Sequence, residues 1–372
     1  MLQKTFAAGI LLACFIRTNS QDLAVIPANI KPPSTTADNS PPEKAPPFTF
    51  SGSADVYYRY DFAKTRANNF TSFTNSHNSF ELGMASVKLE YKASKVSMVA
   101  DLGFGKRATE FSYNDEGVAA AIKQLYVTYA PAGWIKFTAG SWATHVGYEL
   151  VDPQLNRNYS MSYMFTNGPF FHTGIKADLT AGKHGFMIGI ANPTDFKSVP
   201  DGVINRKFLL AQYSLAFNDN TKLYLNYVGG KGIDSTRSSQ FDAVVTGKLS
   251  SKFGIGYNGT VASVHLWNGA KNASGKSWWG SALYLNYDPA SWLGLTLRGE
   301  YFSDKNQLKV YSAAAEGGNI FATTLSANFK INSLTIIPEL RFDNASKKIF
   351  SDKNGAPTSG AGSFLVAAVY AL

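Results

Sequence analysis

Hydrophobic and polar residues alternate with a period of two along most of the chain that follows residue 47. Between Phe48 and Tyr60, aromatic and small apolar residues fall on one face, while Thr49, Asp55 and Arg59 fall on the other. Such alternation is typical of a strand with one apolar and one polar face. The same pattern recurs at 96–104, 222–227 and 293–301. The chain is therefore predicted to be all-β.

Sixteen segments of 8 to 13 residues carry strand patterns. They are 49–60, 79–91, 95–104, 121–130, 134–143, 171–181, 185–192, 207–217, 221–230, 239–249, 252–262, 277–288, 293–303, 319–330, 333–343 and 362–372. Soluble strands usually have about five or six residues, whereas a tilted transmembrane strand needs about 9–11. These lengths indicate strands that cross a membrane.

The connections between these segments alternate between short turns and long polar loops. Turns of two to four residues follow the even-numbered segments. Long loops follow the odd-numbered ones, at 61–78, 105–120, 144–170, 193–206, 231–238, 263–276, 304–318 and 344–361. This is typical of an outer-membrane barrel with short periplasmic turns and long extracellular loops. We therefore predict a transmembrane antiparallel β-barrel of about 16 strands.

Two irregularities are expected within these strands. Pro338 lies in the middle of a predicted strand, and a closed barrel has no free edge to accommodate its missing N–H. A β-bulge is the expected solution there. The alternation also changes phase near Glu81 and Lys123.

Composition supports a barrel and excludes other classes. Charged residues make up only 16% of the chain and aromatic residues 14%, against roughly 25% charged in soluble domains. No segment beyond the N-terminus is apolar enough for a transmembrane helix. The net charge is +9, but Lys and Arg are scattered singly, so no nucleic-acid partner is expected.

The N-terminal 47 residues are predicted to lie outside the barrel. Residues 1–20 have the layout of a signal peptide, with Lys4 before an apolar stretch and small residues near Ser20. Residues 21–47 hold seven of the fifteen prolines and are interpreted as a linker. Cys14 is interpreted as one more apolar signal residue, with a lipoprotein site as the alternative. The barrel is then residues 48–372.

A sixteen-stranded barrel is too wide for side chains to fill, so a water-filled lumen is expected. The alternation places charged side chains of both signs toward it, and the candidate pore-wall residues are Arg59, Lys136, Lys176, Arg298, Arg341, Glu300 and Glu339. Mixed signs predict at most a weak anion preference, because selectivity follows rings of one sign. The alternative is that these charges pair across strands and only hydrate the lumen.

The segment from Gly140 to Ala177 interrupts the strand pattern with about two dozen residues rich in Tyr, Asn, Asp and Met. Its motifs are Thr144-His145-Val146-Gly147-Tyr148-Glu149, Asp152-Pro153, Asn156-Arg157-Asn158-Tyr159-Ser160 and Gly168-Pro169-Phe170-Phe171-His172-Thr173-Gly174. They resemble the central signature of the putative β-barrel porin-2 family, the OmpL-like porins. The resemblance extends from about Phe48 to the C-terminus.

The resemblance implies a Gram-negative outer-membrane porin, in contact with outer-membrane lipid and without a cofactor. The expected function is passive diffusion of small hydrophilic solutes. The resemblance also allows a homo-oligomer, such as the trimer common among general porins.

Long irregular inserts are usually functional or disordered, and the aromatic content of this one speaks against disorder. By analogy with general porins, we predict that loop 144–170 folds into the lumen as a constriction. The candidate contacts are Tyr148, Glu149, Asp152, Asn156, Arg157 and Asn158. Arg157 is expected to oppose Glu149 and Asp152 across the opening. The alternative is that Asp152-Pro153 and Asn156 simply form turns.

Other functions find less support in the sequence. A plugged or structural, adhesive barrel is compatible with the long loops. An outer-membrane enzyme would need a nucleophile beside a histidine, but no nucleophile motif surrounds His145 or His172. No metal-binding motif is found. The chain is therefore predicted not to be an enzyme and to bind no metal.

Overall fold

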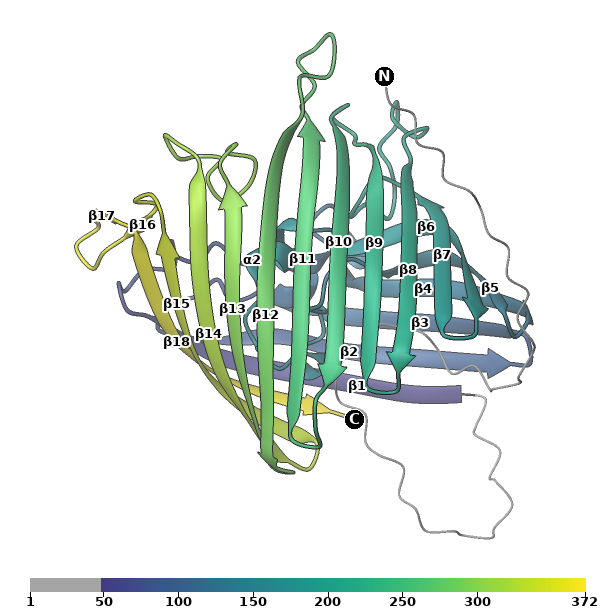
Figure 1. The fold of residues 1–372 in the computed structure, drawn as a ribbon, viewed down its shortest axis with the longest axis horizontal. Coiled ribbons are helices and arrows are strands. Elements are labelled where there is room, and N and C mark those ends of the chain that lie inside the picture. Colours follow the sequence, from purple (N-terminus) through teal and green to yellow (C-terminus); the bar gives the residue numbers. More distant parts are fainter. Residues whose placement is uncertain (1–47) are drawn as a thin grey trace, which may run out of the picture.

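The computed structural model describes residues 48–372, so the predicted signal peptide, with Cys14, and the linker lie outside the described residues. Within them, sixteen antiparallel strands form a closed barrel (Figure 1). Each strand pairs with its neighbours in sequence, and β1 (Phe48–Asp61) closes the barrel by pairing with β18 (Gly360–Ala371). The predicted all-β class, strand number and antiparallel connectivity are confirmed.

The remaining strands of the barrel are β2 (Ser79–Ala93), β3 (Val96–Phe104), β4 (Ile122–Ala132), β5 (Ile135–Ala143), β6 (Phe171–Ala181), β7 (His184–Ala191), β8 (Phe208–Asn218), β9 (Thr221–Lys231), β10 (Arg237–Lys248), β11 (Phe253–His265), β12 (Lys276–Ala290), β13 (Leu293–Asp304), β14 (Gly318–Ile331) and β15 (Leu334–Ala345). A two-stranded hairpin, β16 (Phe350–Ser351) with β17 (Pro357–Thr358), lies in the last long loop. The helical elements are short: α1 (Lys106–Phe111), η1 (Gly117–Ala121), η2 (Pro153–Leu155) and α2 (Tyr163–Asn167). None of these helices is long and apolar enough to cross a membrane.

Short turns join the strands at one rim and long loops join them at the other, as predicted. Five of the long loops are used below. They are L1 (62–78), L2 (105–121), L3 (144–170), L4 (192–207) and L8 (346–359). In Figure 1, α2, which belongs to L3, is seen behind β11 and β12, between the two walls of the barrel. The longest loop therefore lies inside the barrel.

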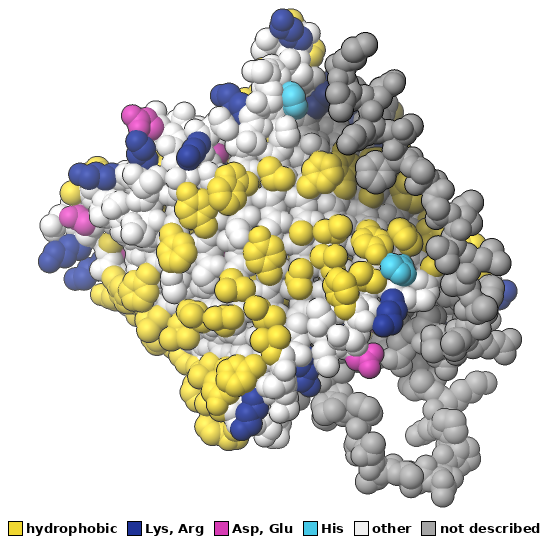
Figure 2. Space-filling view, in the orientation of Figure 1, with side chains coloured by type: hydrophobic (Ala, Val, Ile, Leu, Met, Phe, Trp, Pro, Cys, Tyr) yellow, Lys and Arg dark blue, Asp and Glu magenta, His cyan; other side chains and the backbone are white. Residues whose placement is uncertain are grey.

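The two faces of the barrel differ as the alternation predicted. On β1, Phe50 is 56% exposed on the outer face, whereas Asp55 on the inner face is 4% exposed. Trp134 and Trp292, beside two of the short turns, are also exposed. Figure 2 shows hydrophobic side chains across the middle of this outer face, with charged side chains gathered toward its two ends. Such a surface is matched to the hydrocarbon core of a membrane.

The phase changes predicted near Glu81 and Lys123 are confirmed. The pairing of β1 with β2 shifts between Ala54 and Val56, and that of β3 with β4 shifts between Asp101 and Leu102. Each shift is a bulge that inverts the faces along one strand.

The β-bulge predicted at Pro338 is wrong. The register of β15 with β14 is the same on both sides of Pro338, and pairing with β18 continues through it. Pairing with β14 is instead interrupted at Ile337 and Pro338. The strand accommodates the missing N–H by losing ladder contacts on one side rather than by inserting a residue.

Side chains from three loops pack together at the outer end of the lumen. This cluster comprises Phe73 of L1, Phe111 of L2, Val151, Met161, Phe165 and Phe170 of L3, and Phe171 at the start of β6. A second cluster joins Tyr163 and Met164 of α2 to inward side chains such as Trp278 and Phe302. Apolar packing thus fixes L3 at its outer side.

Candidate functional site

L3 is an ordered loop whose turns are set by its own sequence. Proline at the first position of η2 supplies a fixed backbone angle, and Ser162 caps α2 by accepting a hydrogen bond from the Phe165 amide at 3.0 Å. The Asn156 side chain bonds both backbone groups of Leu150, at 3.0 and 2.5 Å. Asn156 is therefore a turn-forming residue, as the alternative interpretation of the sequence held.

On one side, strand β13 binds L3 through two buried charged residues. Arg298 donates to the Glu149 carboxylate at 2.5 Å and to the Ser160 carbonyl at 2.8 Å. Two residues along, the carboxylate of Glu300 accepts the backbone amides of Tyr163 and Met164, both at 2.9 Å. These amides lie at the N-terminal end of α2, where unpaired N–H groups favour a carboxylate. The Glu300 carboxylate of the wall and the amides at the helix end therefore satisfy each other's hydrogen-bonding capacity.

Strands β14 and β15 continue this arrangement. Glu339 accepts the backbone amides of Tyr159 and Ser160, at 2.8 and 3.1 Å. Arg341 donates to the Met161 carbonyl at 2.7 Å. The Asn158 side chain donates to the hydroxyl of Ser326 on β14, at 2.6 Å. The backbone of residues 158–161 is thus held along three neighbouring strands.

Strands β1 and β4 also bind L3. Lys123 on β4 contacts Asp152 at 2.5 Å and Asp101 of β3 at 3.0 Å, and its side chain is 1% exposed. The Tyr159 hydroxyl bonds Asp55 of β1. Arg107 of α1, fully buried, lies over the Tyr159 ring and donates to the carbonyls of Val151 and Tyr159. L3 is therefore fixed on more than one side of the lumen.

Glycines in the wall make room for two L3 side chains. The Tyr148 ring stacks on Tyr284 at 4.1 Å, and a Cβ at Gly256 of β11 would lie only 2.6 Å from the Tyr148 ring. Arg157 lies against Gly294 of β13 in the same way, with a Cβ-to-guanidinium distance of 2.7 Å. Arg157 also forms a bidentate pair with Asp288, at 2.5 and 3.1 Å.

The opposition predicted between Arg157 and the acids Glu149 and Asp152 is wrong. Among the described residues, Glu149 pairs with Arg298, Asp152 with Lys123, and Arg157 with Asp288. Each loop charge is neutralised by the wall, because burial makes an unpaired charge costly. Of the six candidate constriction residues, Tyr148, Asn156 and Arg157 remain partly exposed, and the other three are buried.

The seven candidate wall residues divide into two groups. Arg298, Glu300, Glu339 and Arg341 bind L3, and Arg59 binds L1 by donating to the Ser76 carbonyl at 2.6 Å. The second group is Lys136 and Lys176, whose amines lie 4.0 and 3.5 Å from Asp178. The side chain of Lys136 is 37% exposed. Only this second group presents charge to open space.

Several residues of the site were not anticipated from the sequence. Arg107 lies in a loop whose burial no local pattern signals, and Asp288 lies near a strand end. Asp195 of L4 accepts the amides of Phe170 and Phe171 at 2.7 and 3.0 Å. Burial raises the pKa of this carboxyl to about 6. A lone aspartate after a proline-containing turn gives no sequence signal for such a role.

The histidines considered for catalysis have structural contacts. His145 bonds the Tyr227 carbonyl at 3.0 Å, and His172 bonds the Thr144 hydroxyl at 3.1 Å. The nearby Glu149 and Ser160 interact with Arg298 instead. Among residues 48–372, no group of three or more His, Cys, Asp or Glu side chains could hold a metal ion.

A comparison with protein families identifies the chain. The family described as "Putative beta-barrel porin-2, OmpL-like" matches residues 47–372. The chain belongs to this porin family. The porin is a multi-pass β-barrel of the outer membrane. Its membership in a porin family supports passive diffusion of solutes as its function. No curated protein matched its sequence.

Solved structures show the same fold at low sequence identity. OmpT of Vibrio cholerae in its trimer form is 12% identical, with a TM-score of 0.59 and coverage of 87% of this porin and 99% of that chain. The outer membrane channel DcaP of Acinetobacter baumannii is 9% identical, with a TM-score of 0.59 and coverage of 87% and 97%. An anion-selective porin from Comamonas acidovorans is 10% identical, with a TM-score of 0.58 and coverage of 87% and 99%.

Proposed function

We propose that this porin lets small hydrophilic solutes diffuse passively through its lumen and that L3 is the constriction. The observation that carries the proposal is the anchoring of L3 inside the barrel, by Arg298 and Glu339 on one side and by Lys123 on another. A loop held at several points narrows the opening without moving. Its partly exposed residues Tyr148 and Arg157 are the proposed solute contacts, while Asn156 shapes the turn through its bonds to Leu150.

The proposed solutes follow from the groups that remain accessible. Arg157 and Asp288 present a polar ion pair, and Asp288 is 37% exposed. On the paired strands β5 and β6, Lys136 and Lys176 share the single acid Asp178, which leaves a local excess of one positive charge. Both signs are present, with a small cationic surplus. Hydrophilic solutes should pass, with a weak preference for anions.

We assign this porin no chemical reaction and no cofactor. The interactions of His145 and His172 with Tyr227 and Thr144 support a structural role for both rings.

We further propose that this porin assembles as a homotrimer. Size-exclusion chromatography with light scattering in detergent tests this; a monomeric mass would contradict it.

A barrel closed by its loops is the second candidate. The apolar cluster formed by L1, L2 and L3 at the outer end of the lumen favours it, because that packing resembles a plug. The two candidates differ in conductance. Stable nanosiemens-scale steps of the purified protein in planar bilayers support the open porin, and a silent protein that migrates as a folded barrel on gels supports the closed one.

The solute range is measured separately by liposome swelling with a graded series of sugars and organic acids. Swelling that falls steeply with solute size supports passive diffusion through a fixed constriction. Saturable uptake of one compound alone would contradict it.

A further inference from the structure

A groove lies on the outer surface of the barrel, at the rim where the long loops emerge. Its volume is about 520 Å³, and it is lined by outward side chains of β14 and β15, by Phe62 of L1 and by L8. Phe321 and Phe342 are 54% and 53% exposed on the lipid-facing surface. The groove therefore opens toward the membrane and not toward the lumen.

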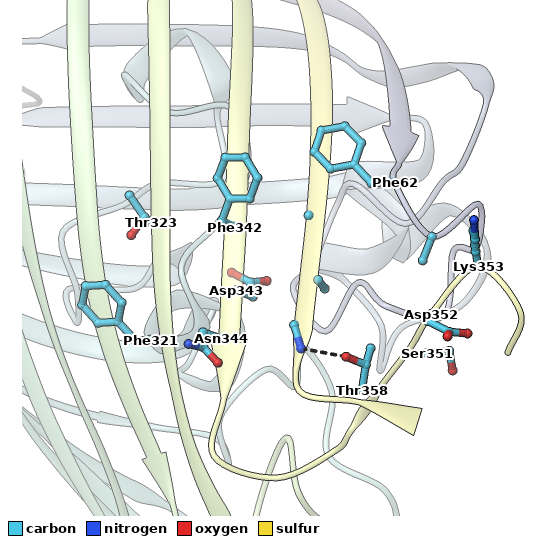
Figure 3. A pocket seen from close by; sticks show the side chains of 14 residues that line it. Phe62, Phe321, Thr323, Phe342, Asp343, Asn344, Ser351, Asp352, Lys353 and Thr358 are labelled. Carbon is cyan, nitrogen blue, oxygen red and sulfur yellow. Dashed lines mark hydrogen bonds between the residues drawn. The ribbon is translucent and has the colours of Figure 1, made fainter. Parts of the chain in front are cut away.

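Two glycines of β18 form the floor of the groove. A Cβ at Gly360 would meet nothing within 4 Å, whereas one at Gly362 would lie 2.8 Å from the Phe62 ring and 3.2 Å from the Phe342 ring. Figure 3 shows Phe62 and Phe342 on either side of this strand. The groove therefore has a floor of backbone and walls of aromatic rings, a shape suited to a narrow apolar ligand.

The mouth of the groove is polar and carries one lysine, Lys353. The hairpin loop of L8 overhangs it with Ser351, Asp352, Lys353 and Thr358 (Figure 3). Asp352 is occupied by the turn itself, since its carboxylate accepts the amides of Asn354 and Ala356 at 2.8 and 2.9 Å. Lys347 pairs with Glu316 of the loop between β13 and β14. Lys348 and Lys353 then face the single acid Asp352 within L8, a net charge of 2 − 1 = +1.

We propose that this groove binds one acyl chain of a phosphate-bearing glycolipid of the outer leaflet, with the phosphate at Lys353. The long loops mark the extracellular rim, so the groove lies at the level of the outer leaflet. The aromatic walls contact the acyl chain. Lys353 attracts the phosphate, because it lies at the headgroup level, where opposite charges attract.

Two substitutions test the apolar and the charged part separately. Gly360→Trp is designed to fill the groove, since a Cβ at this position meets no atom within 4 Å. Lys353→Glu reverses the charge at the mouth. The matched controls are Gly299→Trp and Lys271→Glu. Gly299 is also a strand glycine with no atom within 4 Å of a Cβ, and it lies on β13, outside the groove.

The measurement is the amount of purified lipopolysaccharide retained by the folded barrel after detergent washing, by native mass spectrometry. We expect Gly360→Trp to lower retention at least about tenfold and Lys353→Glu to lower it for phosphorylated but not for dephosphorylated lipopolysaccharide. Both controls should retain as much as the unsubstituted protein. Heat-dependent gel migration checks that each variant is folded, and conductance should stay unchanged.

Three results would overturn the proposal. Unchanged retention in Gly360→Trp excludes the groove as the site. Equal losses in Gly360→Trp and Gly299→Trp indicate a general effect of a bulky lipid-facing residue. Loss of the oligomer in Gly360→Trp with lipid retention intact would show that a second copy of the chain covers the groove.

Discussion

Arg298 anchors L3 to β13 through buried contacts. Its guanidinium is fully buried and joins the Glu149 carboxylate to the backbone of Ser160. Removing one member of a buried pair leaves the other charge without compensation, at a cost of about 3–5 kcal/mol. The pair therefore fixes L3 mainly because separating the two charges would leave one of them buried and uncompensated.

We predict that Arg298→Met releases L3 from β13. Amide hydrogen exchange at 160–164 should accelerate, and conductance should become noisier, because Glu149 must reach water. The double variant Arg298→Met with Glu149→Gln removes both charges and should restore most of the protection. Lys136→Met, at a partly exposed pair, is the control and should change stability by less than about 1 kcal/mol. Unchanged exchange in Arg298→Met would contradict this role.

Asp195 makes the junction of L3 and L4 dependent on pH. Its pKa of about 6 exceeds the ordinary value of 3.8, so the folded protein binds a proton more tightly than the unfolded chain. Its stabilising contribution is then complete below about pH 4 and is lost as pH rises through 6. Oδ1 alone accepts both backbone amides, so a proton on Oδ2 breaks neither of them. The Tyr113 hydroxyl, which donates to Oδ2 at 3.0 Å, then has to accept that proton instead.

Hydrogen exchange of the Phe170 and Phe171 amides, corrected for intrinsic rates, should therefore show stronger protection at pH 4.5 than at pH 7.5. The expected difference is roughly 2–3 kcal/mol at most, from a shift of about two units. Asp195→Asn cannot ionise and should remove the pH dependence. Protection that weakens on acidification would show that the carboxylate, not the acid, stabilises the junction.

At the scale of the element, L3 and the barrel wall fit each other in shape as well as in charge. The Tyr148 ring occupies the space that Gly256 leaves on β11. Gly256→Leu should push the ring toward the lumen and lower the single-channel conductance by some tens of per cent. Gly254→Leu, where a Cβ finds its nearest neighbours at 3.5 Å or beyond, is the control. Equal effects of the two substitutions on conductance would show that displacement of the Tyr148 ring is not the cause.

The elements themselves could be predicted from the sequence because alternation depends on each strand alone. The sixteen strands, the two changes of phase in the alternation and the alternating loops are all local signals. The contacts of L3 are not, since Arg157 and Asp288 lie 131 positions apart, and no local pattern links them. The sequence indicated which loop carries the charges, and only the closed barrel determines which wall residue each one meets.

Pro338 illustrates a second limit. A proline in a strand signals an irregularity, but the sequence does not reveal which neighbouring ladder is interrupted. The structure keeps the register with β14 and omits pairs there, while β18 stays paired. The form of the irregularity is thus a property of the assembled sheet.

At the scale of the whole molecule, the barrel exposes apolar side chains outward and directs most charges inward, where the loops neutralise them. Lys136 and Lys176 are paired within the wall instead, with one acid between them. We predict that Lys136→Gln with Lys176→Gln shifts the reversal potential in a salt gradient toward cations, because Asp178 is then uncompensated. Lys271→Gln, in the loop between β11 and β12, is the control. A reversal potential that does not move would place the conducting path elsewhere.

The central claim is that L3 narrows a conducting lumen, and single-channel recording of the porin beside a variant lacking residues 150–163 tests it most directly. We predict stable nanosiemens-scale steps for the complete protein and larger steps, with altered ion selectivity, for the deletion. The deleted segment contains Arg157, Tyr159 and Ser160, which the wall binds most closely. Equal conductance and selectivity in the two proteins, or no conductance in the complete one, would contradict the account.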